Sequence, residues 1–211
     1  MKTLFFKSLP STQLYLKDLL KGSSPELPLA IVADLQTNGV GSRNNSWISK
    51  EGNLFLSFAL PLSMLPKDLK LESASIYFSY LLKETLAKFG SNVFLKWPND
   101  LYIDESKIGG MITNVVANTL VCGVGINLQK TDEVFGSLDI DISKEELLEE
   151  YFINIEKRVL WKQVFSKYQL NFQTNQKFFT HIDGQKVSLS EALLEDDGSL
   201  NINGQKVYSL R

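Results

Sequence analysis

Hydrophobic and polar positions recur along the chain with spacings that predict both strands and helices. Short apolar or alternating runs, bounded by turn residues, are typical of strands. Within the run from 53 to 60, alternation places Leu54, Leu56 and Phe58 on one face. Strands are expected over Thr3–Ser8, Leu29–Ala33, Asn53–Leu60, Val93–Trp97, Leu101–Ile103, Lys107–Val116 and Thr119–Gly123.

Three longer segments carry the spacing of amphipathic helices. Ser11 or Thr12 can cap the first helix, because a hydroxyl there accepts from a free backbone N–H. The second covers Leu71–Phe89 and ends at Gly90, and the third covers Ser143–Phe172. The strands cluster between the helices and do not alternate with them. The pattern therefore predicts an α+β protein with a mixed β-sheet packed with helices.

The pattern changes after about Lys177. Short strands are expected at Lys186–Leu189, Leu200–Ile202 and Val207–Leu210, with Asn-Gly and Asp-Gly turns between them. This tail is too small to fold alone. We therefore expect a main domain over residues 1–176, followed by a small C-terminal β (SH3-like) module over residues 177–211.

The composition is that of an ordinary globular protein, with no feature typical of nucleic-acid-binding or membrane proteins. The 211 residues are 44% hydrophobic and 22% charged, which is ordinary for a soluble globular protein. The net charge of −2 gives no strong case for nucleic-acid binding. No apolar run reaches the length of a signal peptide core or a membrane span, so a cytoplasmic location without membrane contact is expected.

The counts of reactive residues exclude several kinds of site. Cys122 is the only cysteine, so an internal disulfide and a multi-cysteine zinc site are excluded. Cys122 stands in an apolar run, where a buried, unreactive thiol is the favoured reading over a reactive one. His181 is the only histidine, which excludes a histidine-rich metal centre. No protein metal site is expected.

The segment Gln36–Trp47 follows an expected strand and is rich in small polar side chains. Gly39 and Gly41 let backbone N–H groups converge on an anion. Arg43 offers a charge for a phosphate or a carboxylate. The segment is therefore a candidate anion-binding loop. A plain surface loop is the alternative, because Gly-x-Gly alone is a weak signal.

The segment Lys96–Asp100 reads Lys-Trp-Pro-Asn-Asp and stands at the end of an expected strand. Trp97 is a large apolar plate beside a proline that restricts the backbone. The lysine, asparagine and aspartate side chains offer hydrogen-bond donors and acceptors. The segment is a candidate polar site, and a turn without any ligand is the alternative.

Glycines also stand in two later strands. Lys107 precedes Gly109 and Gly110 inside a strand-like run, where glycine weakens the strand and indicates a close approach to the backbone. The segment Gly123–Asn127 again carries two glycines, and Asn127 can contact a hydroxyl or a base edge. A β-bulge without ligand and a plain strand exit are the respective alternatives.

The order and combination of these segments resemble the catalytic part of bacterial biotin–protein ligases of the biotin operon repressor type. The likeness runs from about residue 3 to residue 130, and the tail ending in Ser-Leu-Arg is similar more loosely. Five motifs in family order make a chance resemblance improbable. They are Ser11-Thr12, Gln-x-x-Gly-x-Gly-x-x-x-x-x-Trp at Gln36 to Trp47, Lys-Trp-Pro-Asn-Asp at Lys96–Asp100, Lys-Ile-Gly-Gly-Met at Lys107–Met111 and Gly-x-Gly-x-Asn at Gly123–Asn127.

The resemblance implies the class II synthetase-like biotin ligase fold and an ATP-dependent activity. Such enzymes form biotinyl-5′-AMP and transfer biotin to a lysine of the biotin carboxyl carrier protein of acetyl-CoA carboxylase, with Mg²⁺ entering with ATP. Lys107 and Arg43 are the implied catalytic residues. The implied biotin-binding residues are Ser11, Thr12, Gln36, Gly39, Gly41, Trp47, Lys107, Gly109 and Gly110. The implied ATP-binding residues are Arg43, Lys96, Trp97, Asn99, Asp100, Gly125 and Asn127.

The chain departs from the family pattern in one loop and in one domain. Val40, Ser42 and Asn45 stand where the family's loop usually carries arginines, so we expect the backbone of Asn38–Ser46 to hold the phosphate and to order over the adenylate. The family's helix-turn-helix domain has no counterpart before Ser11. A ligase without specific DNA binding is therefore expected.

Two other functions remain open. A lipoate–protein ligase shares the implied fold and the acyl-adenylate chemistry, but its Arg-Arg-x-Ser-Gly-Gly-Gly-type loop is missing here. A non-catalytic biotin-binding module is supported only by the missing arginines of the loop.

Overall fold

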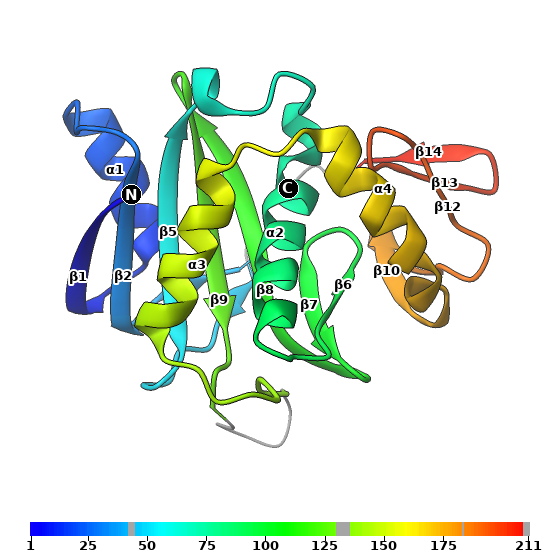
Figure 1. The fold of residues 1–211 in the computed structure, drawn as a ribbon, viewed down its shortest axis with the longest axis horizontal. Coiled ribbons are helices and arrows are strands. Elements are labelled where there is room, and N and C mark those ends of the chain that lie inside the picture. Colours follow the sequence, from blue (N-terminus) through cyan, green and yellow to red (C-terminus); the bar gives the residue numbers. More distant parts are fainter. Residues whose placement is uncertain (42–44, 130–135, 183, 209–211) are drawn as a thin grey trace.

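The computed structural model describes residues 1–41, 45–129, 136–182 and 184–208. Its elements, labelled in Figure 1 where there is room, follow the expected order of strands and helices. They are β1 (Lys2–Leu9), α1 (Thr12–Gly22), β2 (Leu29–Gln36), β3 (Gly39–Val40), β4 (Ser46–Trp47), β5 (Leu54–Pro61), η2 (Leu62–Met64), η3 (Leu71–Ser73), α2 (Ala74–Lys88), β6 (Phe94–Lys96), β7 (Asp100–Ile103), β8 (Ser106–Val116), β9 (Thr119–Ile126), α3 (Lys144–Glu156), α4 (Trp161–Asn171), η4 (Phe172–Lys177), β10 (Phe179–Ile182), β11 (Gln185–Ser188), β12 (Leu193–Leu194), β13 (Leu200–Ile202) and β14 (Gln205–Val207).

Within the described ranges, seven strands form the main sheet in the order β1-β2-β5-β9-β8-β7-β6. β1 and β2 run parallel, and the remaining neighbours run antiparallel. The predicted mixed sheet is therefore confirmed. The predicted start of the first helix is also confirmed, because the Ser11 hydroxyl accepts from the backbone N–H of Leu14. Gly90 follows α2 with a φ of +96°, a conformation that suits glycine at the end of a helix.

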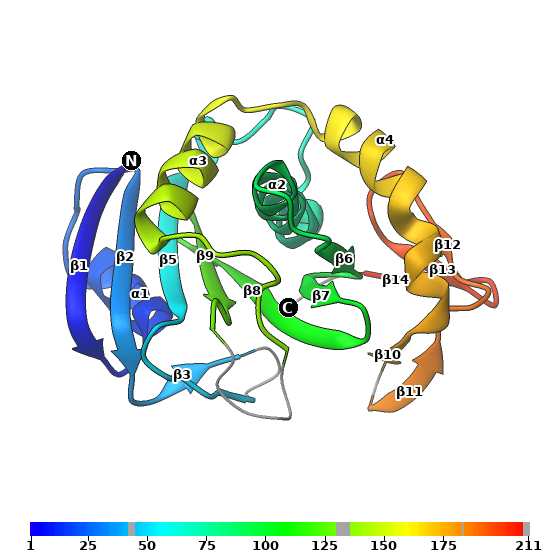
Figure 2. The same ribbon diagram turned by 60° about the horizontal axis from the view of Figure 1, so that its bottom comes forward.

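Helices cover the main sheet on both faces. α2 and α3 lie on one face, and α1 crosses the other face at the β1 end of the sheet (Figures 1 and 2). The alternation expected in β5 is confirmed, because Leu54, Leu56 and Phe58 pack in one hydrophobic cluster and Ala59 packs in the cluster on the α1 face. Every residue from Leu54 to Leu60 is buried, because the side chains of β5 pack under helices on either face.

The single helix expected over Ser143–Phe172 is wrong, because the chain forms two helices, α3 and α4. Arg158 adopts a φ of +46°, which a continuous right-handed helix excludes. A second helix then starts where the carboxylate of Asp68 accepts from the backbone N–H groups of Trp161 (2.9 Å) and Lys162 (3.1 Å). Apolar spacing continues across the break because both helices bury one stripe against the same core.

The C-terminal strands form small separate sheets, as expected from the tail pattern. β10 pairs with β11, and β12, β13 and β14 form a three-stranded sheet. Leu189, Ala192, Leu200 and Ile202 pack in the same hydrophobic cluster as α2 and α4. The last strand ends at Val207, earlier than expected, and residues 209–211 lie outside the described residues. The division at residues 176 and 177 stays a prediction.

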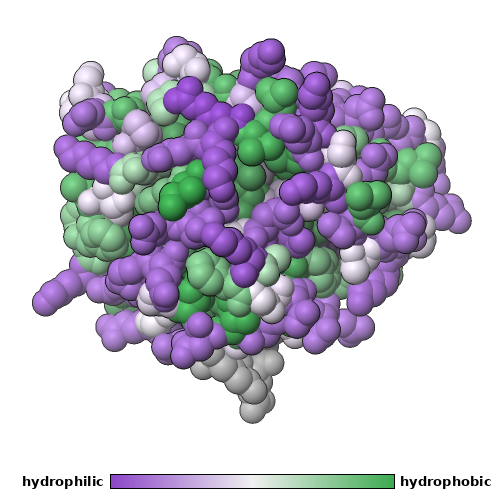
Figure 3. Space-filling model, in the orientation of Figure 1, coloured by the Kyte–Doolittle hydropathy of each residue, from purple (hydrophilic) through white to green (hydrophobic). Residues whose placement is uncertain are grey.

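One face of the molecule is mostly hydrophilic (Figure 3). On the face of α2, α3 and α4, hydrophilic residues cover most of the area, and hydrophobic ones appear in small separate groups (Figure 3). Cys122 is fully buried on β9, as expected, and burial raises the pKa of its thiol well above the ordinary value. In the parts of the chain that the structure describes, no helix is long and apolar enough to cross a membrane.

Candidate functional site

A cavity of about 280 Å³ opens beside the first turn of α1. It lies on the α1 face of the main sheet, because its floor contains Ser57, Gly123 and Ile112, which are register partners on β5, β9 and β8. This volume is close to the lower end for small-molecule sites, roughly 300–1,000 Å³. The described lining residues are Ser11, Thr12, Gln13, Gln36, Val40, Gly41, Asn45, Ser46, Trp47, Ile48, Ser57, Asn99, Asp100, Lys107, Gly110, Met111, Ile112, Gly123, Val124, Gly125 and Asn127.

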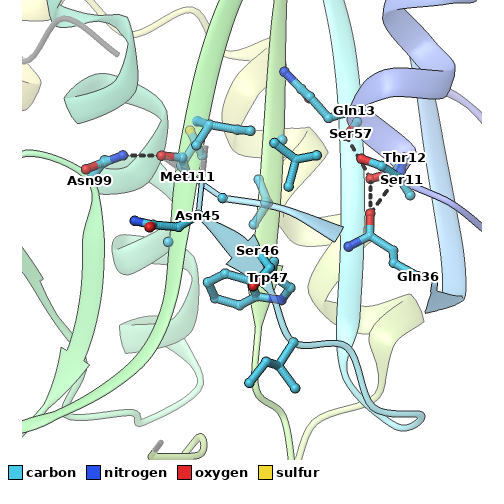
Figure 4. A pocket seen from close by; sticks show the side chains of 18 of the residues that line it. Ser11, Thr12, Gln13, Gln36, Asn45, Ser46, Trp47, Ser57, Asn99 and Met111 are labelled. Atoms are coloured by element: carbon cyan, nitrogen blue, oxygen red, sulfur yellow. Dashed lines mark hydrogen bonds between the residues drawn. The ribbon is translucent and has the colours of Figure 1, made fainter. Parts of the chain in front are cut away.

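One end of the cavity is an uncharged hydrogen-bond network centred on Thr12. The backbone N–H and the hydroxyl of Thr12 both donate to Oε1 of Gln36, at 2.9 and 3.1 Å. The Thr12 hydroxyl also lies 2.9 Å from the hydroxyl of Ser57. Figure 4 shows these side chains together with Ser11 on one side of the cavity. The expected grouping of Ser11, Thr12 and Gln36 is therefore observed.

A short ribbon formed by β3 and β4 carries Trp47 over the middle of the cavity. The indole lies against the backbone of Gly125, where a Cβ would be only 2.5 Å from Cε2 of Trp47. Gly39 pairs with Trp47 across the ribbon, and a Cβ on Gly39 would be 2.6 Å from the Trp47 carbonyl oxygen. The close approach that the sequence predicted at Gly125 is thus made by the protein's own tryptophan.

Lys107 and Asp100 form the charged end of the cavity. The ammonium nitrogen of Lys107 lies 2.6 Å from Oδ1 of Asp100, and both side chains are partly exposed. Gly110 lies beside them, because a Cβ there would be 3.1 Å from the same Oδ1. The Lys107 nitrogen also lies 5.9 Å from the centroid of the Trp47 ring. Among the described residues, a ligand at this end therefore meets one cation, one anion and an aromatic face.

Two asparagines extend the wall at this end. The side-chain amide of Asn99 donates to the carbonyl of Met111, whose N–H donates back to the carbonyl of Asn99 at 2.9 Å. Asn127 uses its amide to donate to the carbonyl of Gly136 at 3.1 Å. Both residues line the cavity, as expected, but their amides also tie neighbouring backbone segments together.

Several of the expected site residues lie outside the cavity lining. Trp97 is 2% exposed and packs in the core. The ammonium of Lys96 lies over the ring of Tyr102, 5.1 Å from its centroid. Gly109 faces the next strand, where a Cβ would be 2.7 Å from the carbonyl oxygen of Gly125. Gly39 is part of β3 in the ribbon and pairs with Trp47, but it is not among the lining residues. Arg43 and Ser42 lie outside the described residues.

Some lining residues were missed by reasoning from the sequence. Gln13 lies in the cavity wall, where its amide donates to Asn114 (3.2 Å) and to the carbonyl of Val121 (3.4 Å). Its position directly after Ser11-Thr12, at the start of a helix, was an available signal. Ser57 is the one hydroxyl within an otherwise apolar, buried strand, and that contrast is a second signal. Asn45 and Met111 stand in the Gln36–Trp47 and Lys107–Met111 segments that the sequence singles out, but neither was named as a site residue.

Buried polar atoms around the cavity lack partners within the described residues. They are Oε1 of Gln13, Nε1 of Trp47 and Oδ1 of Asn99. Buried groups of this kind are normally paired with protein, water or ligand. The arrangement as a whole suits a ligand with a neutral polar head, an apolar middle and an anionic end.

The electrostatics of the charged end also affect a nearby tyrosine. Burial, and then the negative charge of Asp100, raise the pKa of Tyr102 to about 12. Tyr102 therefore stays neutral through the physiological pH range, and its ring is available for the contact with Lys96.

Comparison with known proteins gives both family and fold matches. Residues 5–130 match the model of the Biotin/lipoate A/B protein ligase family. The bifunctional ligase/repressor BirA of Bacillus spizizenii is 31% identical over 135 residues, which are 59% of this chain and 40% of that protein. BirA of Escherichia coli is 34% identical over 106 residues, which are 47% of this chain and 32% of that protein. The chain thus spans less than half the length of these curated relatives.

Two solved structures share the fold over nearly the whole chain. The biotin acetyl coenzyme A carboxylase synthetase from Helicobacter pylori, with bound biotinylated ATP, superposes with a TM-score of 0.94 and 41% identity, covering 98% of this chain and 99% of that one. The biotin protein ligase from Aquifex aeolicus, in complex with biotin and ATP, superposes with a TM-score of 0.78 and 21% identity, covering 98% and 94%. The second likeness concerns the fold alone.

Proposed function

The chain belongs to the biotin/lipoate A/B protein ligase family, and we propose that it is an ATP-dependent biotin–protein ligase. It forms biotinyl-5′-AMP from biotin and ATP. It then transfers biotin to a lysine of a carrier, the biotin carboxyl carrier protein of acetyl-CoA carboxylase. The Helicobacter pylori protein of this fold was solved with biotinylated ATP, and it shares 41% of its residues with this chain.

The observation that carries the proposal is the polarity gradient along the cavity. Biotin has a neutral ureido head, an apolar ring and chain, and a carboxylate end. The head fits the network of Thr12, Gln36 and Ser57, where donors and acceptors are already gathered. The apolar part fits against Trp47, and the carboxylate fits beside Lys107.

In the first step a carboxylate oxygen of biotin attacks the α-phosphorus of ATP, and the bond from that phosphorus to pyrophosphate breaks. Two negatively charged groups must approach each other in this step. Lys107 offsets that repulsion, and its ammonium has three donors, so it can keep Asp100 as a partner while it contacts the reacting oxygens. Positioning and charge stabilisation then supply the catalysis.

The nucleotide is assigned to the wall formed by Asn99, Asp100, Gly125 and Asn127, because these residues line the cavity around Lys107. Arg43 is assigned to the phosphate, as the cation that the sequence retains in the family's loop. We assign Lys96 and Trp97 to the support of this wall, since neither lines the cavity.

Mg²⁺ is expected to enter with ATP. Asp100 is the one carboxylate among the described lining residues, and the described residues contain no cluster of three or more His, Cys, Asp or Glu that could hold a metal. This donor set fits a Mg²⁺ held chiefly by phosphates and water, with few protein ligands. The ion would supply charge neutralisation on the phosphates.

In the second step the ε-amine of the carrier lysine attacks the acyl carbon of the mixed anhydride, and AMP leaves. The chain's part in this step is to hold the adenylate and keep water from it. The carrier's identity and a cytoplasmic location for the reaction both stay predictions.

Mass spectrometry of a biotin carboxyl carrier domain tests the proposal, after incubation with this protein, biotin and MgATP. One biotinyl addition at a single lysine is expected. Omission of ATP should abolish it. The same incubation is repeated with lipoate in place of biotin. Attachment of lipoate and not of biotin would identify a lipoate ligase. Biotin binding without pyrophosphate release identifies a non-catalytic binding module, and either result would overturn the proposal.

A further inference from the structure

Asn175 is fully buried and lies against the outer edge of the main sheet. Its side-chain oxygen accepts from the backbone N–H of Trp97 at 2.6 Å, and its side-chain nitrogen donates to the carbonyl of Leu95 at 3.1 Å. A residue on a parallel strand makes the same pair of bonds, to the residues before and after its partner. The amide of Asn175 thus takes the place of a further strand beside Lys96.

The side chain of Trp97 is held from the same C-terminal part of the chain. Its indole N–H donates to the carbonyl of Gly198 at 2.8 Å. The two preceding carbonyls are also taken, because Asp196 accepts from the indole of Trp161 at 2.9 Å and Asp197 accepts from the hydroxyl of Ser73 at 2.6 Å. Three side-chain donors therefore hydrogen-bond to three consecutive carbonyls of one turn, Asp196 to Gly198.

This turn, Asp196 to Gly198, also packs closely against Ile76 of α2. Gly198 has a φ of +77°, and a Cβ there would be 2.7 Å from Cδ1 of Ile76. Both nitrogens of Trp97, the backbone one and the indole one, are consequently fixed by buried bonds to residues that lie 78 and 101 positions further along the chain.

Trp97 stands two positions before Asn99 and three before Asp100, and both of these line the cavity. Asn99 is bonded to the backbone of Met111, and Asp100 holds the ammonium of Lys107 at 2.6 Å. A short, fully bonded path therefore runs from Asn175 through Trp97 to the charged end of the cavity.

We propose that Asn175 is a positioning residue for the adenylation step: it fixes Trp97, and thereby the placement of Asp100 and Lys107. The inference rests on the proposed function. The proposal distinguishes the two ends of the cavity. Loss of Asn175 disturbs the charged end, where adenylate forms, and leaves the ureido end intact.

The test compares Asn175→Ala with Asn171→Ala. Asn171 is the same residue type four positions earlier, but its amide donates to Tyr80 and to the carbonyl of Lys167, away from the cavity. Biotin-dependent pyrophosphate release in a single turnover measures adenylate formation. Carrier labelling from supplied biotinyl-5′-AMP measures whether the folded site still binds the adenylate and transfers it.

Asn175→Ala should slow adenylate formation by about 10- to 100-fold, the scale of a small misplacement of reacting groups. Labelling from supplied adenylate should stay near the parent rate, and Asn171→Ala should match the parent in both assays. A merely structural role predicts equal loss in both assays, and that result, or an unchanged rate of adenylate formation, would overturn the proposal. If Asn175→Ala does not fold, the same two assays are applied to Trp97→Phe. This variant lacks the indole N–H that donates to the carbonyl of Gly198. A parent protein that releases no pyrophosphate would instead contradict the proposed function itself.

Discussion

The indole of Trp47 lies directly on the bare backbone of Gly125, in the space that a side chain on Gly125 would occupy. The two residues come from different parts of the chain, the β3–β4 ribbon and the centre of the sheet. Their contact sets how deep the middle of the cavity is, because Trp47 is the large apolar side chain that forms its wall there.

Gly125→Ala should therefore weaken biotin binding. The new Cβ would lie 2.5 Å from Cε2 of Trp47, so the ring must shift, and a shift of this size is expected to raise the KM for biotin by roughly 10- to 100-fold. Steady-state kinetics with varied biotin measure the change. Gly22→Ala is the matched control, since nothing lies within 4 Å of a Cβ at Gly22. An unchanged KM in Gly125→Ala would mean that the ring position does not matter for the ligand.

Lys107→Ala should slow adenylate formation by roughly 10²–10³-fold, the cost of removing one preorganised charge-stabilising donor. The fold should change little, because the side chain is partly exposed and contributes little to the core. Supplied biotinyl-5′-AMP should partly restore carrier labelling, since its carboxylate is already activated. Single-turnover pyrophosphate release gives the rate.

The control for this substitution is Lys88→Ala, which also breaks an ion pair, 2.8 Å from Lys88 to Glu150, but on α2 and away from the cavity. It should release pyrophosphate at the parent rate. The role assigned to Lys107 is wrong if Lys107→Ala also keeps the parent rate, or if supplied adenylate gives no rescue.

Thr12→Val should destabilise the protein by about 1–3 kcal/mol, because it leaves the buried Ser57 hydroxyl without its partner and removes one bond to Gln36. Urea unfolding followed by circular dichroism gives the free energy of unfolding. Thr3→Val is the control, because the Thr3 hydroxyl bonds only locally, to the carbonyl of Met1, at the partly exposed start of the chain. Equal stabilities of the two variants would argue against the Thr12 network.

The stability of the C-terminal turn should fall in acid. Burial opposes ionisation of Asp197, but hydrogen bonds from Lys206 and Ser199 outweigh it and lower its pKa to about 2, from an ordinary value of 3.8. Because the pKa of Asp197 is lower in the folded protein than in the unfolded chain, its charge stabilises the fold at pH values above the unfolded-state pKa. This contribution is lost as the pH falls through the folded-state pKa. The window is therefore about pH 4 to pH 2.

Asp197→Asn tests this window. The free energy of unfolding of the variant should lie below that of the parent at pH 5, and the gap should narrow as the pH falls to about 2. Asp196→Asn, in the exposed neighbouring position, should track the parent throughout. A gap that does not change with pH would show that the Asp197 charge is not the cause.

Local chemistry made much of the site predictable. Ser11 caps a helix, and an isolated hydroxyl or glycine in an apolar strand has a local reason to be noticed. The close packing of Trp47 on Gly125 was foreseen only in part, because the sequence indicates that something approaches Gly125 but does not say whether it is ligand or protein. Identifying the approaching group needs the tertiary structure.

Other features depend on long-range geometry. The ion pair of Lys107 with Asp100 requires β7 and β8 to pair with a register shift between Leu101 and Tyr102, and no local pattern specifies that shift. The break between α3 and α4 was missed because apolar spacing continues through it, while its causes are a left-handed residue and a distant carboxylate, that of Asp68.

The amide of Asn175 has a consequence for the behaviour of the sheet in solution. An exposed edge strand is a template on which another chain can add a strand, and β6 is one of the two edges of this sheet. By occupying the carbonyl of Leu95 and the N–H of Trp97, Asn175 blocks strand addition at this edge. Intermolecular growth of the main sheet is thereby restricted to the opposite edge, β1, so aggregation through strand pairing should be directional.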